Sequence, residues 1–290
     1  MSSFDPRLTP ARPDLAADFL RGKVEAERFV PGTPMRVVAP SAPVRKIPAP
    51  DASLVTEALC GETVTIYERT LEGWSWGQLD ADGYVGWLPD EALGLPAAAP
   101  NARVVALRTP VFPGPSIKLP VAAMLSMGSR LAIVDEREGF AVTDGGGFVF
   151  AGHLAALDAI EPDFVKVAAR FLGTPYVWGG RSSLGLDCSG LVQVALAGAG
   201  IAAPRDSDMQ EATLGEKVPF DGDLATLRHG DLVFWPGHVG IVEIVGKSEV
   251  LLHATAAYMA VVREPLGAAL ARIAAAGAPV RTVRRLNPAQ

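Results

Sequence analysis

The spacing of hydrophobic positions changes near residue 160, and this change divides the chain into two kinds of structure. From about Glu161 onward, apolar residues recur at helical spacing, with Pro162 near the start of the pattern and Gly173 just past its end. The residues of this apolar face are Phe164, Val167, Ala168, Phe171 and Leu172. Because proline fits the first turn of a helix and glycine commonly ends one, the pattern predicts a helix at the start of the last region.

A second helix is predicted to begin at Cys188, because Asp187 is a good N-cap and Gly198 and Gly200 can end the helix. Its apolar stripe consists of Leu191, Val192, Ala195, Leu196 and Ala199. Three apolar runs of strand length follow, then a helical stretch and a closing strand-like segment. In order, these segments read GDLVFW, GHVGIVEIV, EVLLHAT, EPLGAALARIAAAG and VRTVRRL. The last domain, residues 159–290, is therefore predicted to be α+β.

The region before residue 160 contains an internal repeat at an offset of 67 residues. RVVAPSAPV, starting at Arg36, recurs as RVVALRTPV, starting at Arg103, and GYVGW at Gly83 is answered by GFVFA at Gly147. Each copy reads as short β-branched and aromatic strands separated by Pro, Gly and Asp turns, which predicts a small β-barrel. The strand and turn order resembles that of bacterial SH3-like domains. The predicted organisation is an N-terminal extension (1–30), a first barrel (31–98) and a second barrel (99–158).

Composition narrows the class of protein. The 290 residues are 49% hydrophobic and carry 26 basic against 32 acidic residues, a formal charge of −6, without a basic cluster that could follow a phosphate backbone. Nucleic acid is therefore not an expected partner. The N-terminus lacks the apolar core of a secretory signal and no run is long enough for a membrane span, so a cytoplasmic location is expected and no membrane partner. The oligomeric state is not predicted.

The chain has two cysteines, Cys60 and Cys188, which are too few for a disulfide framework. Cys60 is interpreted as a small buried hydrophobe. Cys188 follows glycines that are expected to leave room for a substrate backbone, and it is predicted to start a helix, where the dipole and a neighbouring imidazolium would lower its pKa. Its environment therefore favours a nucleophile over core packing.

The base must be one of four histidines, at positions 153, 229, 238 and 253. If the hairpin turn centres near Val245–Gly246, the numbers of facing residues sum to about 491, as those of His238 and His253 do. The residues therefore predict Cys188 as nucleophile, His238 as base and His253 as the group that orients the base, with the Cys188 N–H helping to hold an oxyanion. Zinc binding by the same three residues is disfavoured because no close ligand pair exists, and no metal or cofactor is expected.

Three segments carry a specific resemblance. GTPYVWGGRSSLGLDCSGLVQ, GDLVFWPGHVGIV and LLHAT, in this order, resemble the signature blocks of the NlpC family of papain-like cysteine peptidases. The resemblance covers about Glu161 to Leu286 and implies a papain-like α+β catalytic domain preceded by the two SH3-like barrels. It implies cleavage of cell-wall peptides between γ-linked D-glutamate and a diamino acid by Cys188, His238 and His253. It also implies Tyr176 beside the acyl carbonyl, and Asp187 and Ser189 lining the substrate groove.

The segment PRDSDMQ, residues 204–210, resembles a further block of those family members that recycle short murein peptides. The resemblance implies that Asp206 and Ser207 contact the free N-terminal amine of the peptide and that Tyr84 of the first barrel contacts the same terminal alanine. Its acidic partner is either Glu57 or Glu62. Plainer interpretations stay open, because Asp206 or Ser207 could simply cap a helix and Tyr84 could be a barrel aromatic.

The function expected is therefore a cysteine endopeptidase (a γ-D-glutamyl-L-diamino acid endopeptidase) acting on short murein peptides with a free N-terminal L-Ala, in peptidoglycan recycling. Arg181 or Arg205 could supply the positive charge that an acidic peptide needs. Two alternatives remain: an acyl or amide transferase on the same scaffold, since an amine can capture a thioester, and a protein that binds wall peptides with a dormant triad.

Overall fold

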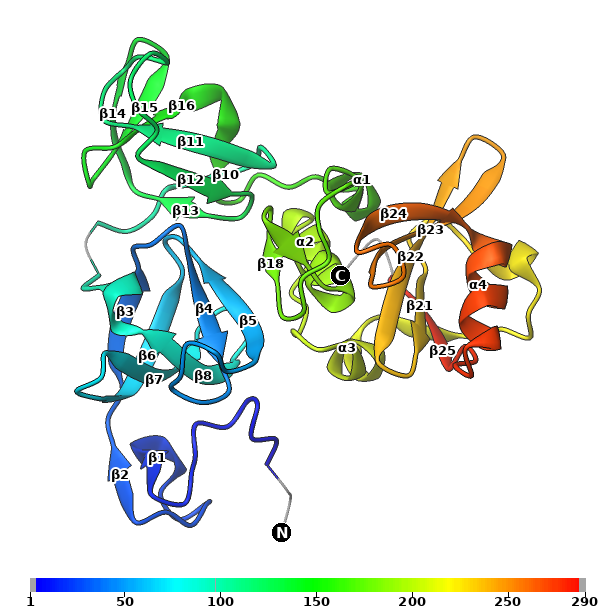
Figure 1. Cartoon of the computed structure of the whole chain (residues 1–290), viewed down its shortest axis with the longest axis horizontal. Helices are drawn as coiled ribbons and strands as arrows, with labels where there is room; N and C mark the ends of the chain where they lie inside the picture. Colours follow the sequence, from blue (N-terminus) through cyan, green and yellow to red (C-terminus); the bar gives the residue numbers. More distant parts are fainter. Residues whose placement is uncertain (1–3, 97, 287–290) are drawn as a thin grey trace. The chain divides into compact units, whose positions relative to one another are not determined.

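The computed structural model describes residues 4–96 and 98–286, and it divides into two compact units after Ala159 (Figure 1). Residues 1–3, 97 and 287–290, which belong to the predicted extension, first barrel and catalytic domain, lie outside the described residues. No helix in the described part of the chain is long and apolar enough to cross a membrane.

The first unit begins with a segment that is folded, although the sequence predicted only an extension there. Strands β1 (Leu15–Ala17) and β2 (Arg28–Val30) pair in parallel. Leu15 is fully buried against Trp76 and Trp87, and the guanidinium of Arg12 lies 4.3 Å from the centroid of the Trp76 ring. Aromatic faces attract cations, so this segment is held on the following β region by both apolar and cation–π contacts.

The first β region contains seven strands whose apolar residues alternate between core and surface. They are β3 (Thr33–Val37), β4 (Ser41–Arg45), β5 (Leu54–Leu59), β6 (Thr63–Arg69), β7 (Trp74–Leu79), β8 (Val85–Pro89) and β9 (Leu93–Gly94). They form one antiparallel sheet in the order β5-β4-β8-β7-β6-β3-β9. Because successive side chains of a strand point to opposite faces of the sheet, every second residue lies in the core.

The second β region repeats these pairings with smaller sheets. Its strands are β10 (Ala102–Val104), β11 (Arg108–Phe112), β12 (Ala123–Ser126), β13 (Arg130–Leu131), β14 (Ile133–Arg137), β15 (Phe140–Thr143), β16 (Phe148–Phe150) and β17 (Leu154–Ala156). In the first region β3 pairs with β6 and β9, and in the second region β10 pairs in the same way with β13 and β17. Likewise, β4 pairs with β5 and β8, and its counterpart β11 pairs with β12 and β16. The repeat seen in the sequence is thus also a repeat of strand pairing.

The second unit is α+β, as the sequence predicted. Its helices are α1 (Phe164–Ala169), α2 (Cys188–Gly198), α3 (Ser207–Thr213) and α4 (Leu266–Ala275). Its strands are β18 (Arg181–Ser182), β19 (Gly185–Leu186), β20 (Glu216–Val218), β21 (Leu232–Trp235), β22 (His238–Val245), β23 (Ser248–Thr255), β24 (Ala260–Pro265) and β25 (Thr282–Arg285). Six of the strands form an antiparallel sheet in the order β20-β25-β21-β22-β23-β24.

Helices α2 and α4 flank this sheet (Figure 1). The face toward α4 is a closed apolar core in which Val242 and Leu251 pack against Leu266, Ala269 and Ile273. Helix α2 packs on β22 and β23. The sheet thereby holds the N-terminus of α2 near the start of β22.

Two sequence predictions for the second unit differ from this structure. Helix α1 ends at Ala169, before Phe171 and Leu172, because the chain there forms a turn toward Gly173 with φ of +79°. Strand β24 was not predicted, although it completes the sheet beside β23.

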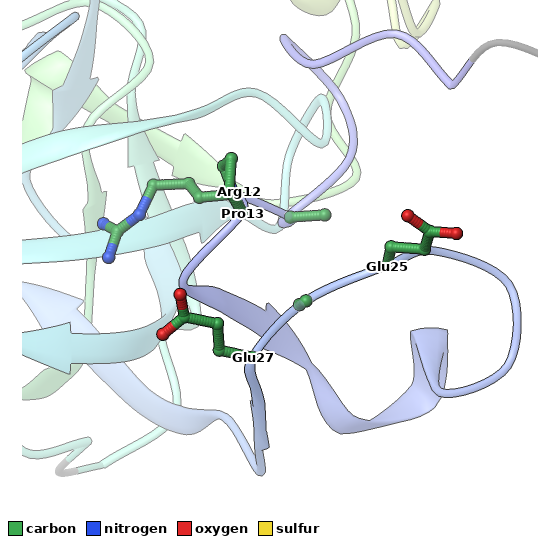
Figure 2. A pocket seen from close by; sticks show the side chains of 6 residues that line it. Arg12, Pro13, Glu25 and Glu27 are labelled. Carbon is green, nitrogen blue, oxygen red and sulfur yellow. The ribbon is translucent and has the colours of Figure 1, made fainter.

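An open pocket of about 630 Å³ lies beside the N-terminal segment of the first unit (Figure 2). Its lining residues are Ala11, Arg12, Pro13, Glu25, Ala26 and Glu27. Arg12 points away from Glu25 in Figure 2, toward the tryptophans and carboxylates that bind it. None of the predicted site residues lines this pocket.

Candidate active site

Cys188 is the first residue of α2, and the residue before it makes the helix begin there. The Asp187 side chain accepts a 2.7 Å hydrogen bond from the N–H of Gly190, which is an N-cap interaction. Cys188 itself is only 6% exposed. The predicted helix start is confirmed.

A buried ion pair holds this helix start in place. Arg205, 1% exposed, donates to both carboxylate oxygens of Asp187, at 2.9 and 2.7 Å. The same carboxylate accepts the N–H of Gly179 at 2.9 Å and lies 3.3 Å from the Ser189 hydroxyl. Asp187 therefore joins the Gly179 turn, the first turn of α2 and the segment before α3.

The PRDSDMQ segment supplies a second support. The Gln210 amide donates to the carbonyl oxygens of Ser189 and Pro204, both at 2.9 Å. Arg205 and Gln210 thus both act on the first turn of α2.

The same network bears on several expected site residues. Asp187 and Ser189 are buried and hydrogen bonded within the protein, where they support the start of α2. Their place in the substrate groove stays a prediction. Arg181 is also buried, and Arg205 is committed to Asp187, so neither offers a free charge to an acidic peptide.

The glycines near Cys188 serve the protein's own backbone. A Cβ on Gly190 would lie 2.3 Å from the carbonyl oxygen of Gly180, and a Cβ on Gly180 would lie 2.5 Å from that of Gly185. Real side chains do not fit at such distances. The expectation that these glycines make room for substrate is replaced by close packing of the turn on α2.

His238 and His253 lie together, although not in the predicted register. Observed partners such as Ile241 with Leu252, and Val245 with Ser248, have numbers that sum to 493, because the turn is formed by Gly246 and Lys247. The two histidines are therefore diagonal neighbours on one face of the hairpin, which is still within reach of ring side chains. His238 Nε2 lies 3.0 Å from His253 Nδ1.

Cys188 lies beside the residue that follows His238, because the Val239 N–H hydrogen bonds to the sulfur. Burial, followed by the charge of Asp187, raises the pKa of Cys188 to about 11. Burial, followed by the neighbouring His253, lowers the pKa of His238 to about 3. The lowered thiol pKa expected from the helix end is therefore wrong for the resting protein, in which thiol and imidazole are both neutral.

Tyr176 is half-buried and belongs to the same cluster. Burial, with the nearby Cys188 and Asp187, raises the pKa of its phenol to about 12. The phenol therefore stays protonated at neutral pH and can donate a hydrogen bond beside the thiol.

The other predicted contacts are placed less directly. Asp206 and Ser207 are half-buried at the start of α3, and Asp206 makes no side-chain cap hydrogen bond there. Tyr84 is 5% exposed and belongs to the core of the first β region, which agrees with its plainer interpretation as a barrel aromatic. Their contacts with substrate stay predictions.

Sequence reasoning missed two charged residues beside the histidines. Glu264 in β24 lies 3.4 Å from His253 Nε2, and Arg272 in α4 binds its two carboxylate oxygens at 2.9 and 2.7 Å. No motif marks this pair, since it joins a strand to the following helix. The remaining histidines bind elsewhere, His153 to Thr109 and His229 to Asp163.

Among the residues that the structure describes, no group of three or more His, Cys, Asp or Glu side chains could hold a metal ion. The chemistry at hand is that of a thiol hydrogen bonded by the Val239 N–H, next to the strand that begins with His238, and of a second imidazole hydrogen bonded to His238. This set can carry out nucleophilic acyl transfer.

Comparison with known proteins agrees with this description. Residues 173–269 match the NlpC/P60 family, and residues 44–93 match the bacterial dipeptidyl-peptidase SH3 domain. The chain therefore contains an NlpC/P60 domain together with a bacterial SH3 domain.

Similar curated proteins include dipeptidyl-peptidase 6 of Lysinibacillus sphaericus, 36% identical over 31% of this chain and 32% of that protein. A γ-D-glutamyl-L-lysine dipeptidyl-peptidase of Bacillus cereus is 27% identical over 63% of this chain and 60% of its own length. The alignments thus span less than two thirds of these relatives. The crystal structure of an NlpC/P60 family protein from Bacillus cereus shares the fold, with a TM-score of 0.71 and 21% identity over 87% of this chain and 99% of that one.

Arg205→Ala is expected to destabilise the second unit by about 3–5 kcal/mol, because it leaves the Asp187 carboxylate buried without its cation. Urea unfolding followed by the helical circular dichroism signal measures this, since the described α-helices all lie in the second unit. The control is Arg170→Ala, which removes a half-exposed 3.7 Å pair with Glu161 and should cost no more than about 1 kcal/mol. Equal effects of the two changes would contradict the role given to Arg205.

The stability of the second unit is expected to fall as the pH drops below about 6.5, in part because of His253. Burial lowers the pKa of His253 to about 4, so between these values the unfolded chain binds a proton that the folded chain does not. The contribution of His253 to the free energy of unfolding is complete above pH 6.5 and is lost toward pH 4. Between these values the free energy of unfolding changes by up to about 1.4 kcal/mol per pH unit. Unfolding curves of His253→Gln should show a flatter acid dependence than wild type, and identical slopes would exclude this assignment.

Alkylation of Cys188 by iodoacetamide is expected to accelerate with pH up to about 10 or beyond, because only the thiolate reacts. The measurement uses a Cys60→Ser background, so that mass spectrometry reports Cys188 alone. A rate that is already constant below pH 6 would instead indicate a thiolate–imidazolium pair in the resting protein.

Proposed function

We propose that this protein is a cysteine endopeptidase that hydrolyses the γ-D-glutamyl–diamino acid bond of short murein peptides with a free N-terminal L-Ala, in peptidoglycan recycling. The observation that carries the proposal is the placement of Cys188 at the start of α2, next to a β22–β23 hairpin on which His238 and His253 are hydrogen bonded. The family match of residues 173–269 supports a peptidase, and the name of the similar γ-D-glutamyl-L-lysine dipeptidyl-peptidase supports the γ-D-glutamyl bond.

The first half of the reaction forms an acyl-enzyme. His238 takes the proton of Cys188 as the sulfur attacks the carbonyl carbon of the γ-linked D-glutamate. The oxyanion receives hydrogen bonds from the Cys188 N–H at the helix start and from the Tyr176 hydroxyl. The intermediate then expels the amine of the diamino acid, which His238 protonates, and leaves a thioester on Cys188.

The second half releases the dipeptide. A water molecule gives its proton to His238 and attacks the thioester, and the sulfur leaves and recovers its proton. Because thiol and imidazole are neutral at rest, the proton transfer belongs to the reaction itself rather than to the free enzyme.

Recognition of the free N-terminus is the finer part of the proposal. Asp206, half-buried at the start of α3, supplies the carboxylate for the amine, with Ser207 beside it. The matching strand pairings of β10–β17 support a second SH3-like barrel. A cytoplasmic location belongs to the same proposal and can be tested by cell fractionation.

The deciding experiment incubates the protein with L-Ala-γ-D-Glu-diaminopimelate, free and N-acetylated, and follows the products by mass spectrometry. We expect L-Ala-D-Glu from the free peptide, little from the acetylated one, and none with Cys188→Ala. Cys60→Ala is the matched control and should remain active.

Other outcomes separate the alternatives. Equal cleavage of both peptides would keep the peptidase and remove recognition of the N-terminus. Acyl transfer to added amines in place of hydrolysis would favour a transferase, and binding without any turnover would favour a binding protein. Turnover by Cys188→Ala would refute the nucleophile.

A further inference from the structure

The carboxylate of Glu264 lies 3.4 Å from Nε2 of His253, the ring nitrogen that does not contact His238. Strand register pairs His253 with Val262 and Leu251 with Glu264, so Glu264 and His253 share the face of the sheet that α4 covers. Arg272 of α4 binds both Glu264 oxygens, and one of these oxygens lies 3.4 Å from His253 Nε2. A continuous series of side-chain contacts thus runs from Arg272 through Glu264 and His253 to His238.

The charge of Glu264 determines which nitrogen of His253 carries the proton. The two hydrogen bonds from Arg272 lower the pKa of Glu264, so its carboxylate is ionised and can only accept hydrogen bonds. His253 is fully buried, and its Nε2 has no better-placed partner among the described residues. A lone pair on Nε2 would face the lone pairs of the carboxylate, whereas an N–H there is attracted to it. The proton of neutral His253 therefore resides on Nε2.

The tautomer of His253 then determines that of His238. With its proton on Nε2, His253 has a lone pair on Nδ1, which lies 3.0 Å from His238 Nε2. That contact is a hydrogen bond only if His238 Nε2 carries a proton. Neutral His238 therefore has its free lone pair on Nδ1, the ring nitrogen that His253 does not occupy.

We infer that Glu264, held by Arg272, is a positioning residue that sets the tautomers of both histidines and leaves His238 Nδ1 as the base. The inference deepens the proposed function and rests on it for its catalytic part. When Nδ1 takes the Cys188 proton, the His238 ring carries protons on both nitrogens. Its Nε2–H still donates to His253, and the Glu264 charge stabilises the imidazolium through that ring.

The direct test is the nitrogen NMR spectrum of protein labelled with 15N-histidine, recorded at neutral pH without substrate. Protonated and unprotonated ring nitrogens have distinct chemical shifts. The four histidines can be assigned with His153→Gln and His229→Gln variants. We expect protons on Nε2 and lone pairs on Nδ1 in both His238 and His253. A proton on His253 Nδ1 in the wild-type protein would overturn the inference, whatever any variant does.

Glu264→Gln tests the cause. The amide can offer only one oxygen, so it cannot accept both hydrogen bonds of Arg272 and the His253 N–H. We expect mixed or reversed tautomers, and a kcat lowered by roughly 10- to 100-fold with little change in KM, because the substrate contacts are intact.

Glu243→Gln is the matched control. Glu243 is similarly buried in β22, which β23 separates from β24, and Arg263 binds its two oxygens at 2.7 Å each. Among the described residues, no histidine is hydrogen bonded to Glu243. This variant loses a comparable ion pair, so a stability effect alone would appear in both. The control should keep the wild-type tautomers and kcat.

The two proposals can fail separately. Wild-type tautomers and kcat in Glu264→Gln would refute the role of Glu264 while leaving the peptidase intact. The expected tautomers in a protein that cleaves no peptide would leave the positioning role standing and remove the endopeptidase.

Discussion

The buried pair of Asp187 and Arg205 is the interaction on which the site depends. One carboxylate caps α2, binds the Gly179 turn and neutralises Arg205, so three separate segments between residues 179 and 205 meet at the residue before Cys188. Desolvating two charges is costly, and such a pair is favourable only when its hydrogen-bonding groups are satisfied. Glycine at position 190 lets the backbones approach closely enough for this to happen.

The two β regions share one pattern of strand pairing but differ in the side chains that they offer to the N-terminal segment. In the first region, Trp76 and Trp87 receive Leu15 and Arg12 from the N-terminal segment. The segment GFVFA of the second region has Ala151 where GYVGW has Trp87, so the second region lacks this platform for the same segment. The family match to residues 44–93 falls within the first region.

Local signals were enough to predict much of the second unit. Asp187 followed by an apolar stripe marked α2, and the apolar runs marked β21, β22 and β23. The hairpin register was misplaced because Gly246 could stand at either turn position, and a shift of one residue in the turn moves the pairing by two. The Glu264–Arg272 pair was invisible in the sequence, since it depends on how α4 returns over β24.

The same burial that orders the site opposes the ionisation of its thiol. Helix position alone suggested a lowered pKa for Cys188, yet Asp187 lies next to it and water is largely excluded, so the pKa rises. The support for the helix and the activation of the nucleophile are thus in conflict. A base whose free lone pair is fixed on one ring nitrogen resolves this conflict, because the proton then needs to move only when a carbonyl carbon is ready to receive the sulfur.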